Sequence, residues 1–341
     1  MPGKIQLVLP GLFDLPLSEF KPEMLADGLP ALNRILRFAN PRPNPAFSID
    51  AILRRVLAME TPGQSASLPL AQSCALPAQH QPRRLLLFQA VHLRPDLHSA
   101  IIVPIQNNQE NLHDVNIIIN DLRDLFNVDC DITDVATGLF LIALKEFDAP
   151  HHYPHILSVL GKAANPYVEQ SRQNLGWYKL LNEMQMFLHQ HQVNRDREQR
   201  GLLPANSLWF WGGGMRPDKF DKGIVWYCED SVLNRFAANL GLRTLPFDDL
   251  TKLVSSAEAA VIDLRLLEQL KTGAAKKLEP LLLDIENRLL QPLLRTIERD
   301  RKSLFLQAGF ESDFELGAGA ALKFWRRPRN LASWSGQERV S

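Results

Sequence analysis

One stretch of the sequence decides the expected fold: His189-Gln-His-Gln-Val-Asn-Arg-Asp-Arg-Glu-Gln-Arg-Gly-Leu-Leu-Pro-Ala-Asn-Ser-Leu-Trp-Phe-Trp-Gly-Gly-Gly214. Residues 175–191 before it have apolar side chains at helical spacing, which predicts an amphipathic helix. Imidazole, amide and guanidinium groups then crowd the end of that helix. A short aromatic strand, residues 207–211, and a triple-glycine turn follow. This order of parts is typical of α/β proteins that bind an anionic ligand.

The polar groups of this stretch form the candidate binding site. Arginine offers a planar fork of donors suited to phosphate or carboxylate, and glycines after a strand let backbone N–H groups approach an anion. Alternatives stay open. Residues 195–200 can instead be a solvated charged loop, and Trp209 and Trp211 can be core residues of a strand. The three glycines at 212–214 can simply form a turn, since turns use glycine routinely. The predicted ligand-binding residues are His191, Asn194, Arg197, Asn206, Gly212, Gly213 and Gly214.

The composition is that of an ordinary globular protein. The chain has 341 residues, 45% of them hydrophobic, and 38 Lys and Arg balance 38 Asp and Glu. A neutral balance gives no general attraction to nucleic acid or to an anionic membrane, so we expect neither partner. Cys74, Cys130 and Cys228 form no Cys-x-x-Cys pair, which favours free thiols in a reducing cytoplasm. The apolar run at residues 5–9 is too short for a signal peptide or a membrane helix, and we expect a cytoplasmic bacterial protein.

Apolar patterning predicts strands that alternate with helices. Strands are expected at residues 5–9, 85–91, 99–104, 138–144, 207–211, 224–228, 259–264, 303–306 and 320–325. Helices are expected at residues 29–38, 49–59, 112–126, 175–191, 231–240 and 278–299. The alternation favours a mostly parallel sheet with helices on both faces. We expect a single α/β domain over residues 1–330, with a Pro/Ala/Ser-rich surface excursion at about 40–84 and a loose tail over 331–341.

A family resemblance is carried by the string His191-x-Val-Asn194-x-x-Arg197-x-x-x-Gly201-x-x-Pro204-Ala205-Asn206-x-x-Trp209-x-Trp211-Gly212-x-Gly214. It resembles the matching stretch of archaeal-type cofactor-independent phosphoglycerate mutases, members of the alkaline phosphatase superfamily. It is closer still to proteobacterial proteins described as phosphoglycerate-mutase-like or as regulators of pathogenicity factors, which share the lead-in Glu183-Met-Gln-Met-x-Leu-His189. Weaker similarities to these proteins lie at residues 9–14, 91–94 and 231–241. The resemblance implies an alkaline-phosphatase-like α/β fold.

The same resemblance implies chemistry that the sequence lacks. The mutases use two divalent metals and a Ser or Thr nucleophile. Their first metal loop reads Leu-Asp-Gly-Leu-Gly-Asp, and Pro10 stands here in place of the ligating Asp. The superfamily takes metal-binding histidines from its C-terminal half, but all nine histidines lie at or before His191. Asp263 stands near the position of the family's Asp-x-x-x-His motif, but the residue four positions later is Leu267 and not a histidine. Residues 311–315 stand where the family has an Asp-His pair, and they contain no histidine.

Other candidates carry weaker signals. Ser65 and Ser67 fall roughly where the family places its serine, but the spacing is broken, which favours loop serines. His151, His152 and His155 cluster between prolines without a ligand-spaced cysteine or carboxylate, which favours a solvated loop over a metal site; His92 and His98 could reach a pocket at a strand end. We therefore predict no catalytic residue and no metal ligand.

Two hypotheses for the function follow. In the first, the chain is a catalytically degenerate phosphoglycerate-mutase-like protein that has no cofactor. It acts as a regulatory or ligand-binding protein. Its retained segment would hold a small phosphorylated or carboxylate ligand, or an internal structural partner, and a protein partner is also possible. In the second, the chain is an active metal-dependent phosphoglycerate mutase or phosphohydrolase with substituted ligands, and its cofactor is Mn or Mg.

Overall fold

The structure is a computed structural model of the chain. It describes residues 3–44, 48–60, 67–75, 84–106, 108–148, 150, 153–171, 174–246, 258–273, 277–309, 312–318 and 331. The predicted strand at 320–325, nearly all of the predicted tail, and Ser65, His151 and His152 lie outside these residues. No helix within the described ranges is long and apolar enough to span a membrane.

The chain folds into two compact units, whereas the sequence predicts one domain. Unit 1 comprises Met1–Phe47, Arg55–Ala58 and Asp221–Ser341, and unit 2 comprises Ser48–Arg54 and Met59–Phe220. The difference has a simple cause. The segment between the first two strands of the parallel sheet is long enough to build a sheet and core of its own, and apolar patterning does not reveal which strands share a sheet.

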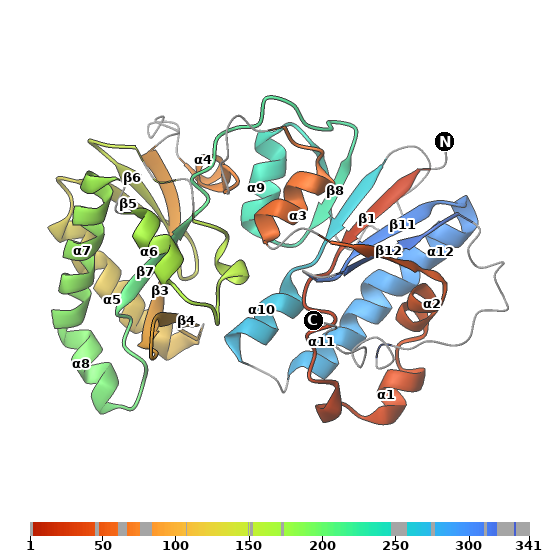
Figure 1. Cartoon of the computed structure of the whole chain (residues 1–341), viewed down its shortest axis with the longest axis horizontal. Coiled ribbons are helices and arrows are strands. Elements are labelled where there is room, and N and C mark those ends of the chain that lie inside the picture. The colour runs from red at the N-terminus through yellow and green to blue at the C-terminus, as the bar shows by residue number, and fades with distance from the viewer. Residues whose placement is uncertain are drawn as a thin grey trace. The chain divides into compact units, whose positions relative to one another are not determined.

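Unit 1 is built on a seven-stranded mixed sheet (Figure 1). Five neighbouring strands are parallel, and the two at one side run antiparallel to their neighbours. In sheet order the strands are β2 (Asn40–Pro43), β12 (Ser312–Leu316), β11 (Ser303–Gln307), β1 (Lys4–Val8), β10 (Ala259–Ile262), β8 (Val225–Cys228) and β9 (Arg243–Leu245). The predicted strands at 5–9, 224–228, 259–264 and 303–306 are confirmed.

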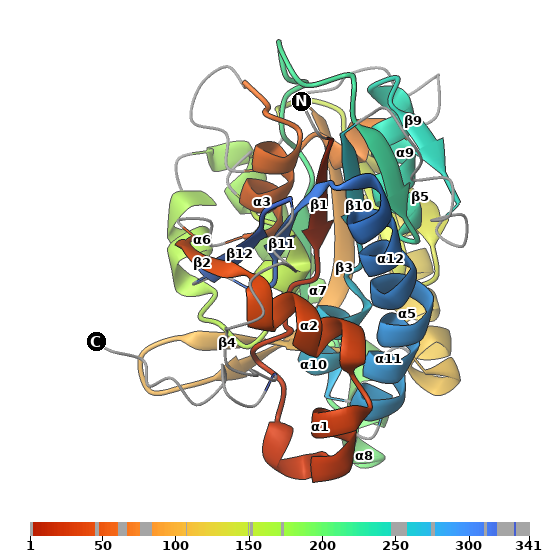
Figure 2. The same cartoon turned by 90° about the vertical axis from the view of Figure 1, so that its right-hand side faces the viewer.

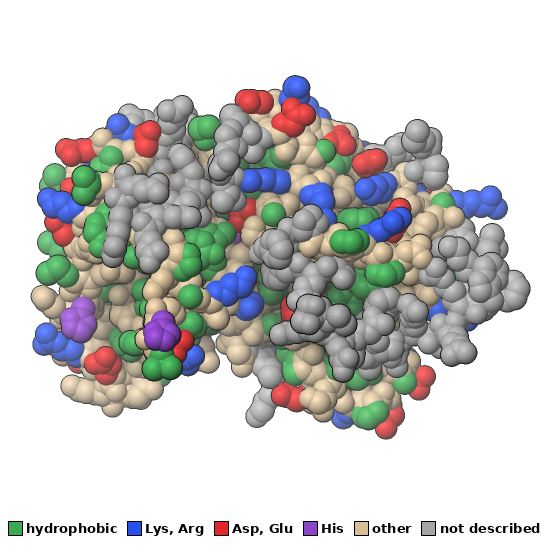
Figure 3. Space-filling model, in the orientation of Figure 1, with side chains coloured by type: hydrophobic (Ala, Val, Ile, Leu, Met, Phe, Trp, Pro, Cys, Tyr) green, Lys and Arg blue, Asp and Glu red, His purple; other side chains and the backbone are tan. Residues whose placement is uncertain are grey.

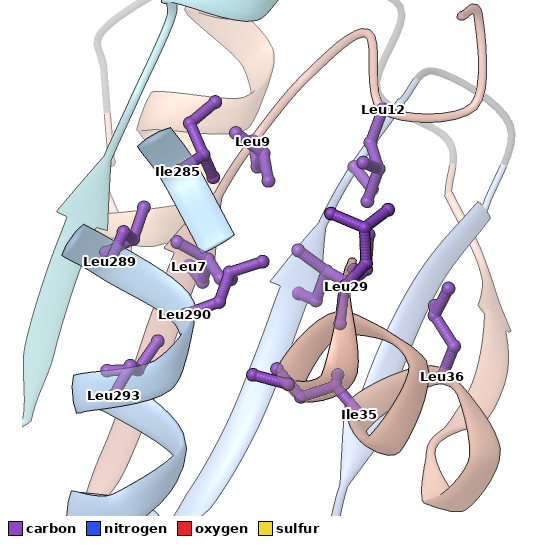
Figure 4. Packing of buried hydrophobic residues seen from close by; sticks show 14 of the residues in the cluster. Leu7, Leu9, Leu12, Leu29, Ile35, Leu36, Ile285, Leu289, Leu290 and Leu293 are labelled. Carbon is purple, nitrogen blue, oxygen red and sulfur yellow. The ribbon is translucent and has the colours of Figure 1, made fainter. Parts of the chain in front are cut away.

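One face of this sheet carries the main core of unit 1. Alternate side chains of β1, such as Ile5 and Leu7, are fully buried with Leu304 and Leu306 of β11. Helices α2, α11 and α12 pack on this face (Figures 2 and 4). The helices of unit 1 are α1 (Pro22–Asp27), α2 (Pro30–Phe38), α9 (Ser231–Asn239), α10 (Arg265–Thr272), α11 (Leu278–Ile285) and α12 (Gln291–Asp300). The long helix predicted at 278–299 is present, but a π-helical turn at Glu286–Leu290 joins α11 to α12.

Unit 2 is built on an antiparallel sheet. Its strands are β4 (Ala100–Pro104), β3 (Leu85–Pro95), β6 (Leu139–Leu144) and β5 (Cys130–Ala136), and β7 (Ser207–Trp211) pairs with β3. Its helices are α4 (Leu70–Cys74), α5 (Gln109–Leu125), α6 (Asn165–Ser171), α7 (Leu175–Gln190) and α8 (Gln192–Gln199), and α3 (Ile49–Val56) is divided between the units after Arg54. Phe210 of β7 packs on Trp177 of α7, with ring centroids 4.7 Å apart.

The structure corrects two expectations about the decisive stretch. First, the predicted mostly parallel sheet exists only in unit 1. The β7 strand that follows the polar segment lies in the antiparallel sheet of unit 2, where Leu87–Val91 pair with Ser207–Trp211. Second, residues 195–200 do not form a charged loop, since α8 continues to Gln199. Its buried face consists of Asn194 and Arg197, so it lacks the apolar periodicity that marks a helix in a sequence.

On the face shown in Figure 3, Lys and Arg side chains lie among Asp and Glu side chains of the described residues.

Candidate functional site

Arg197, the central residue of the predicted anion site, is buried and bound by protein groups. Its side chain is 1% exposed. Nε donates to the carbonyl of Leu203 at 2.9 Å, and the terminal nitrogens donate to Asp114 and Asn111 of α5, each at 2.8 Å. Arg200 also binds Asp114, at 2.6 Å. The guanidinium therefore ties α8 to α5 and to the loop that leads into β7.

His191 and Asn194 have local partners as well. His191 caps α8 by accepting from the amide of Val193 through Nδ1, and its Nε2 lies 3.1 Å from Asp121 of α5. The side-chain Nδ2 of Asn194 donates to the carbonyls of Leu188 and Ala205, and its Oδ1 accepts from the backbone amide of Ala205. All three bonds of Asn194 go to backbone groups. They close the α7–α8 corner over the loop at residues 200–206.

Asn206 and the three glycines lie at the two ends of β7. The Asn206 side chain accepts from the Leu93 amide at 2.7 Å and donates to the Leu93 carbonyl at 3.1 Å, which extends the pairing of β3 with β7. At the other end, the Gly212 amide donates to Ser67 Oγ at 3.0 Å. A Cβ on Gly214 would collide with the Ser67 carbonyl oxygen. Close approach of two backbones, rather than anion binding, is the local reason for this glycine.

The structure does not bring the seven predicted residues to one place. His191, Asn194 and Arg197 lie at the α7–α8 corner, Asn206 directly precedes β7, and the glycines follow the far end of that strand. Ser67 lies beside the glycines, but its side chain is buried and its hydroxyl accepts from Gly212. His92 lies 2.9 Å from the Pro204 carbonyl, and the His155 ring packs at a tilt of 59° against Trp211 in the core, where burial lowers the pKa of His155 to about 3.

The carboxyl edge of the parallel strands in unit 1 is a stronger candidate for a site. There the ends of β11, β1 and β10 meet, because the Leu9 amide donates to the Gln307 carbonyl and the Asp263 amide donates to the Val8 carbonyl. Open α/β sheets bind their ligands beyond this edge, next to the strand where the connections change direction. That strand here is β1, since the chain passes from β10 on one side of it to β11 on the other.

An arginine-centred network occupies this edge beside β10 and β8. Arg265 opens α10, and its guanidinium binds both oxygens of Asp263, Nε to Oδ1 at 3.0 Å and the second bond at 2.7 Å. A third bond, at 2.9 Å, reaches Asp284 of α11, and Glu229, which follows β8, lies 3.5 Å away. Arg288 lies 3.8 Å from Glu229 and 3.6 Å from Asp284. Two guanidiniums thus face three carboxylates, and the hydrogen bonds to Asp263 raise the pKa of Arg265.

This arrangement does not fit a two-metal centre. Divalent cations need deprotonated carboxylate oxygens that are free to coordinate them. Both oxygens of Asp263 already hold Arg265, and Pro10 offers no side-chain ligand at the end of β1. Among the residues that the structure describes, no group of three or more His, Cys, Asp and Glu could hold a metal ion.

A second polar cluster lies beside the end of β11. Asp313 of β12 is fully buried and accepts from Arg55 at 2.7 Å and from Asn44 at 2.9 Å. Arg55 also donates to the Asn44 side chain, and Asn44 donates to the carbonyl of Gly309. Burial raises the pKa of Asp313 to about 6, although Arg55 opposes the shift.

Asp263 is a candidate from the sequence alone, but its partners Arg265, Asp284 and Glu229 were not predicted. Two signals were available in the sequence. Asp263-x-Arg265 lies at the end of one predicted strand, and Glu229 directly follows another. Charged residues at the ends of parallel strands often meet at one edge of a sheet. The contact with Asp284 joins segments 19 residues apart and has no signal in the sequence.

Comparison with known proteins gives a partial match. No protein-family model matches the chain. It is 29% identical over 83 residues to the 2,3-bisphosphoglycerate-independent phosphoglycerate mutase of Methanosarcina mazei, a match that spans 24% of this chain and 19% of that protein. Among solved structures, the PH0037 protein from Pyrococcus horikoshii aligns with a TM-score of 0.49 and 14% identity over 93% of this chain and 88% of that one. The cofactor-independent phosphoglycerate mutase from Thermoplasma acidophilum aligns with a TM-score of 0.43 and 15% identity over 99% and 96%.

Proposed function

We propose that this chain is a phosphoglycerate-mutase-like protein that does not carry out metal-dependent phosphoryl transfer and acts instead as a regulatory or ligand-binding protein. The relation to the mutases is supported by the string from His191 to Gly214 and by the 83-residue match to the Methanosarcina enzyme. The proposal includes an alkaline-phosphatase-like architecture for unit 1, with the former reaction centre at the carboxyl edge of its parallel strands. The observation that carries the loss of activity is the binding of Arg265 to Asp263.

Electrostatics explains why Arg265 excludes a metal. Two unit charges 4 Å apart interact by about 4 kcal/mol near a protein surface, and a dication beside a guanidinium would feel about twice that repulsion. The cation would also have to displace two short bonds from a carboxylate that is 1% exposed. Arg265 already supplies the positive charge that Asp263 needs, so the network is stable without a metal.

The polar segment from His191 to Asn206 then has a structural role. Its side chains bind Asp114, Asn111 and backbone carbonyls, which favours the internal partner over a phosphorylated or carboxylate ligand. The segment preserves the corner between α7, α8 and β7. Its resemblance to the mutases reflects a shared scaffold in this proposal, and a regulatory ligand or protein partner would bind elsewhere.

Manganese binding tests the proposal. Calorimetric titration of Mn²⁺ should show no stoichiometric site in the wild-type protein. Arg265→Gln frees both oxygens of Asp263 and leaves only Arg288 near Asp284 and Glu229, so this variant should bind Mn²⁺ at least tenfold more tightly. Arg299→Gln is the matched control, because Arg299 is exposed and forms an ion pair with its neighbour Asp300, away from the Arg265 network. It should behave as the wild type.

The alternative is a metal-dependent mutase or phosphohydrolase that uses Mn or Mg with substituted ligands. Stoichiometric Mn²⁺ in the wild type, lost on Asp263→Asn, would favour that alternative. Equal, weak binding by the wild type and Arg265→Gln would show that Arg265 is not what keeps the cation out.

A further inference from the structure

Exposed apolar side chains lie at one end of the helix pair α5 and α7 in unit 2. The two helices are neighbours (Figure 1), and the Phe126 ring at the end of α5 meets the Phe187 ring of α7 with centroids 6.3 Å apart. Directly beside these rings in the chain, Leu125 is 59% exposed and Met186 is 62% exposed. Val128, in the turn that follows α5, is 76% exposed. One exposed apolar side chain is ordinary, whereas three around one ring contact mark an interaction surface.

Helix geometry places these side chains on one surface. Asp121 of α5 lies 3.1 Å from His191 at the α7–α8 corner, so this face of α5 turns toward α7. Leu125 comes four residues after Asp121 and therefore lies one turn further along the same face. On α7, Met186 is the exposed neighbour of the half-buried Phe187. Four residues form the surface that we call the α5–α7 patch: Leu125, Val128, Met186 and Phe187.

The rim of the α5–α7 patch is acidic. Asp124 and Asp129 flank the end of α5, and neither has an ion-pair partner among the residues that the structure describes. The neighbouring cations are each bound in an ion pair at 3.0 Å: Arg123 to Asp134 and Lys145 to Asp131. The charge that remains unpaired at this rim is therefore negative.

We propose that the α5–α7 patch is a docking site for an amphipathic helix of a partner protein that carries Lys or Arg beside its apolar face. The apolar side chains of that helix cover Leu125 and Met186, and its cations face Asp124 and Asp129. The backbone groups of α5 and α7 are bonded within their own helices, so the patch offers no strand edge to an extended peptide. Side chains alone make the contact.

The charge of the rim disfavours two other occupants. A second copy of this chain, related by a twofold axis, would bring the same carboxylates together, and like charges across an interface oppose association. An anionic lipid surface would be repelled for the same reason. A basic partner instead pairs with Asp124 and Asp129, which is why the patch favours that partner.

This inference does not depend on the proposed function. The α5–α7 patch belongs to unit 2, whereas the Arg265 network belongs to unit 1. Mn²⁺-dependent turnover by the protein would overturn the proposed function and leave the docking site untouched.

Peptide binding is the first test. A fluorescein-labelled peptide of two Lys-Leu-Leu-Lys-Lys-Leu-Leu heptads should bind the full chain saturably in fluorescence anisotropy, and the same peptide with Glu in place of Lys should not. Raising NaCl from about 50 to about 300 mM should weaken binding, because salt screens the exposed carboxylates. No saturable binding of the Lys peptide, or equal binding of both peptides, would overturn the inference.

Matched variants locate the bound peptide. Leu125→Gln and Met186→Gln should each weaken binding of the Lys peptide by about tenfold. Asp124→Asn, which leaves every apolar contact in place, should weaken it as well. Leu175→Gln is the control, because Leu175 is 80% exposed at the other end of α7, and it should bind as the wild type does.

These substitutions are at exposed positions, so the thermal midpoint of each variant should stay close to that of the wild type. Wild-type affinity in both Leu125→Gln and Asp124→Asn, or an equal loss of affinity in Leu175→Gln, would overturn the inference.

Two further measurements test the other occupants. Sedimentation velocity of the wild type should show no dimer that Leu125→Gln abolishes, and phosphatidylglycerol vesicles should not bind the protein through the patch. A dimer, or vesicle binding, that Leu125→Gln abolishes would assign the patch to that occupant and overturn the inference.

Discussion

Arg197 shows that an arginine that predicts a ligand site in a sequence can instead bind other groups of the same protein. Guanidinium groups bind phosphate and carboxylate ligands well, but they bind a protein carboxylate and amide with the same geometry. In this chain Asp114 and Asn111 occupy the terminal nitrogens of Arg197. The sequence predicts Arg197 as a ligand-binding residue, whereas its carboxylate partner in the fold, Asp114, lies 83 residues away in the sequence.

Loss of the Arg197 guanidinium should destabilise the protein. Arg197→Met leaves Asn111 without this donor and Asp114 with Arg200 alone, so the cost should be up to the about 3–5 kcal/mol of a broken buried charge pair. Arg195→Met, an exposed arginine on the same helix, should change the free energy of unfolding by no more than about 0.5 kcal/mol. Urea unfolding of the two variants measures the difference. Equal stabilities would contradict the structural role of Arg197.

Asp313 should make stability depend on pH. In an unfolded chain an aspartate loses its proton at about pH 4, whereas burial raises the pKa of Asp313 to about 6 in the folded protein. Between these values the folded state binds more protons, so the free energy of unfolding falls as the pH rises and then levels off.

Asp313→Asn isolates this effect, because other buried carboxyls contribute equally to both proteins. The stability of the wild type relative to the variant should fall from pH 4 to pH 6 in urea unfolding. A relative stability that is constant or rises over this range would show that burial does not dominate at Asp313.

At the scale of elements, apolar patterning identified the buried strands and missed those whose residues are polar or half exposed. The strands β1, β3, β4, β6, β7, β8, β10 and β11 each contain a short run of apolar residues, and each was predicted. By contrast β2 reads Asn-Pro-Arg-Pro, and β5 buries only alternate residues at its start. The α8 helix was missed for a related reason, since a buried Asn and Arg form its inner face.

The π-helical turn between α11 and α12 also has a consequence for a neighbouring helix. Its first residue, Glu286, is fully buried and accepts from the amides of Ala31 and Leu32 at 2.6 and 3.0 Å. These amides begin α2, whose own N-cap, Leu29, has no side-chain acceptor. Glu286 therefore caps α2 from a distant part of the chain.

Removing this cap should loosen α2 selectively. Glu286→Ala should cost about 1–2 kcal/mol and speed hydrogen exchange at the Ala31 and Leu32 amides. Glu298→Ala on α12, which breaks only an exposed pair with Arg34, should cost less than about 1 kcal/mol and leave these amides protected. Mass spectrometry of peptides that cover α2 measures the hydrogen exchange of these amides in both variants. Unchanged exchange in Glu286→Ala would mean that α2 does not need the remote cap.

At the scale of the whole molecule, the sequence predicted an α/β protein but not its division. Strand positions follow from local patterning, while the assignment of β7 to an antiparallel sheet depends on its pairing with β3, more than 100 residues earlier. The absence of histidines after His191 was visible in the sequence. The bond between Arg265 and Asp263 depends on the fold, because α10 begins directly after β10 and brings the guanidinium onto the carboxylate.

The most direct test of the central claim is phosphoryl transfer itself. Interconversion of 2- and 3-phosphoglycerate should be measured with and without added Mn²⁺ for the wild-type protein and for Asp263→Asn. If the Arg265 network stands where a metal centre would be needed, Mn²⁺ will produce no turnover in the wild type above that of the variant. Mn²⁺-dependent turnover in the wild type that falls at least 100-fold in Asp263→Asn would contradict the account.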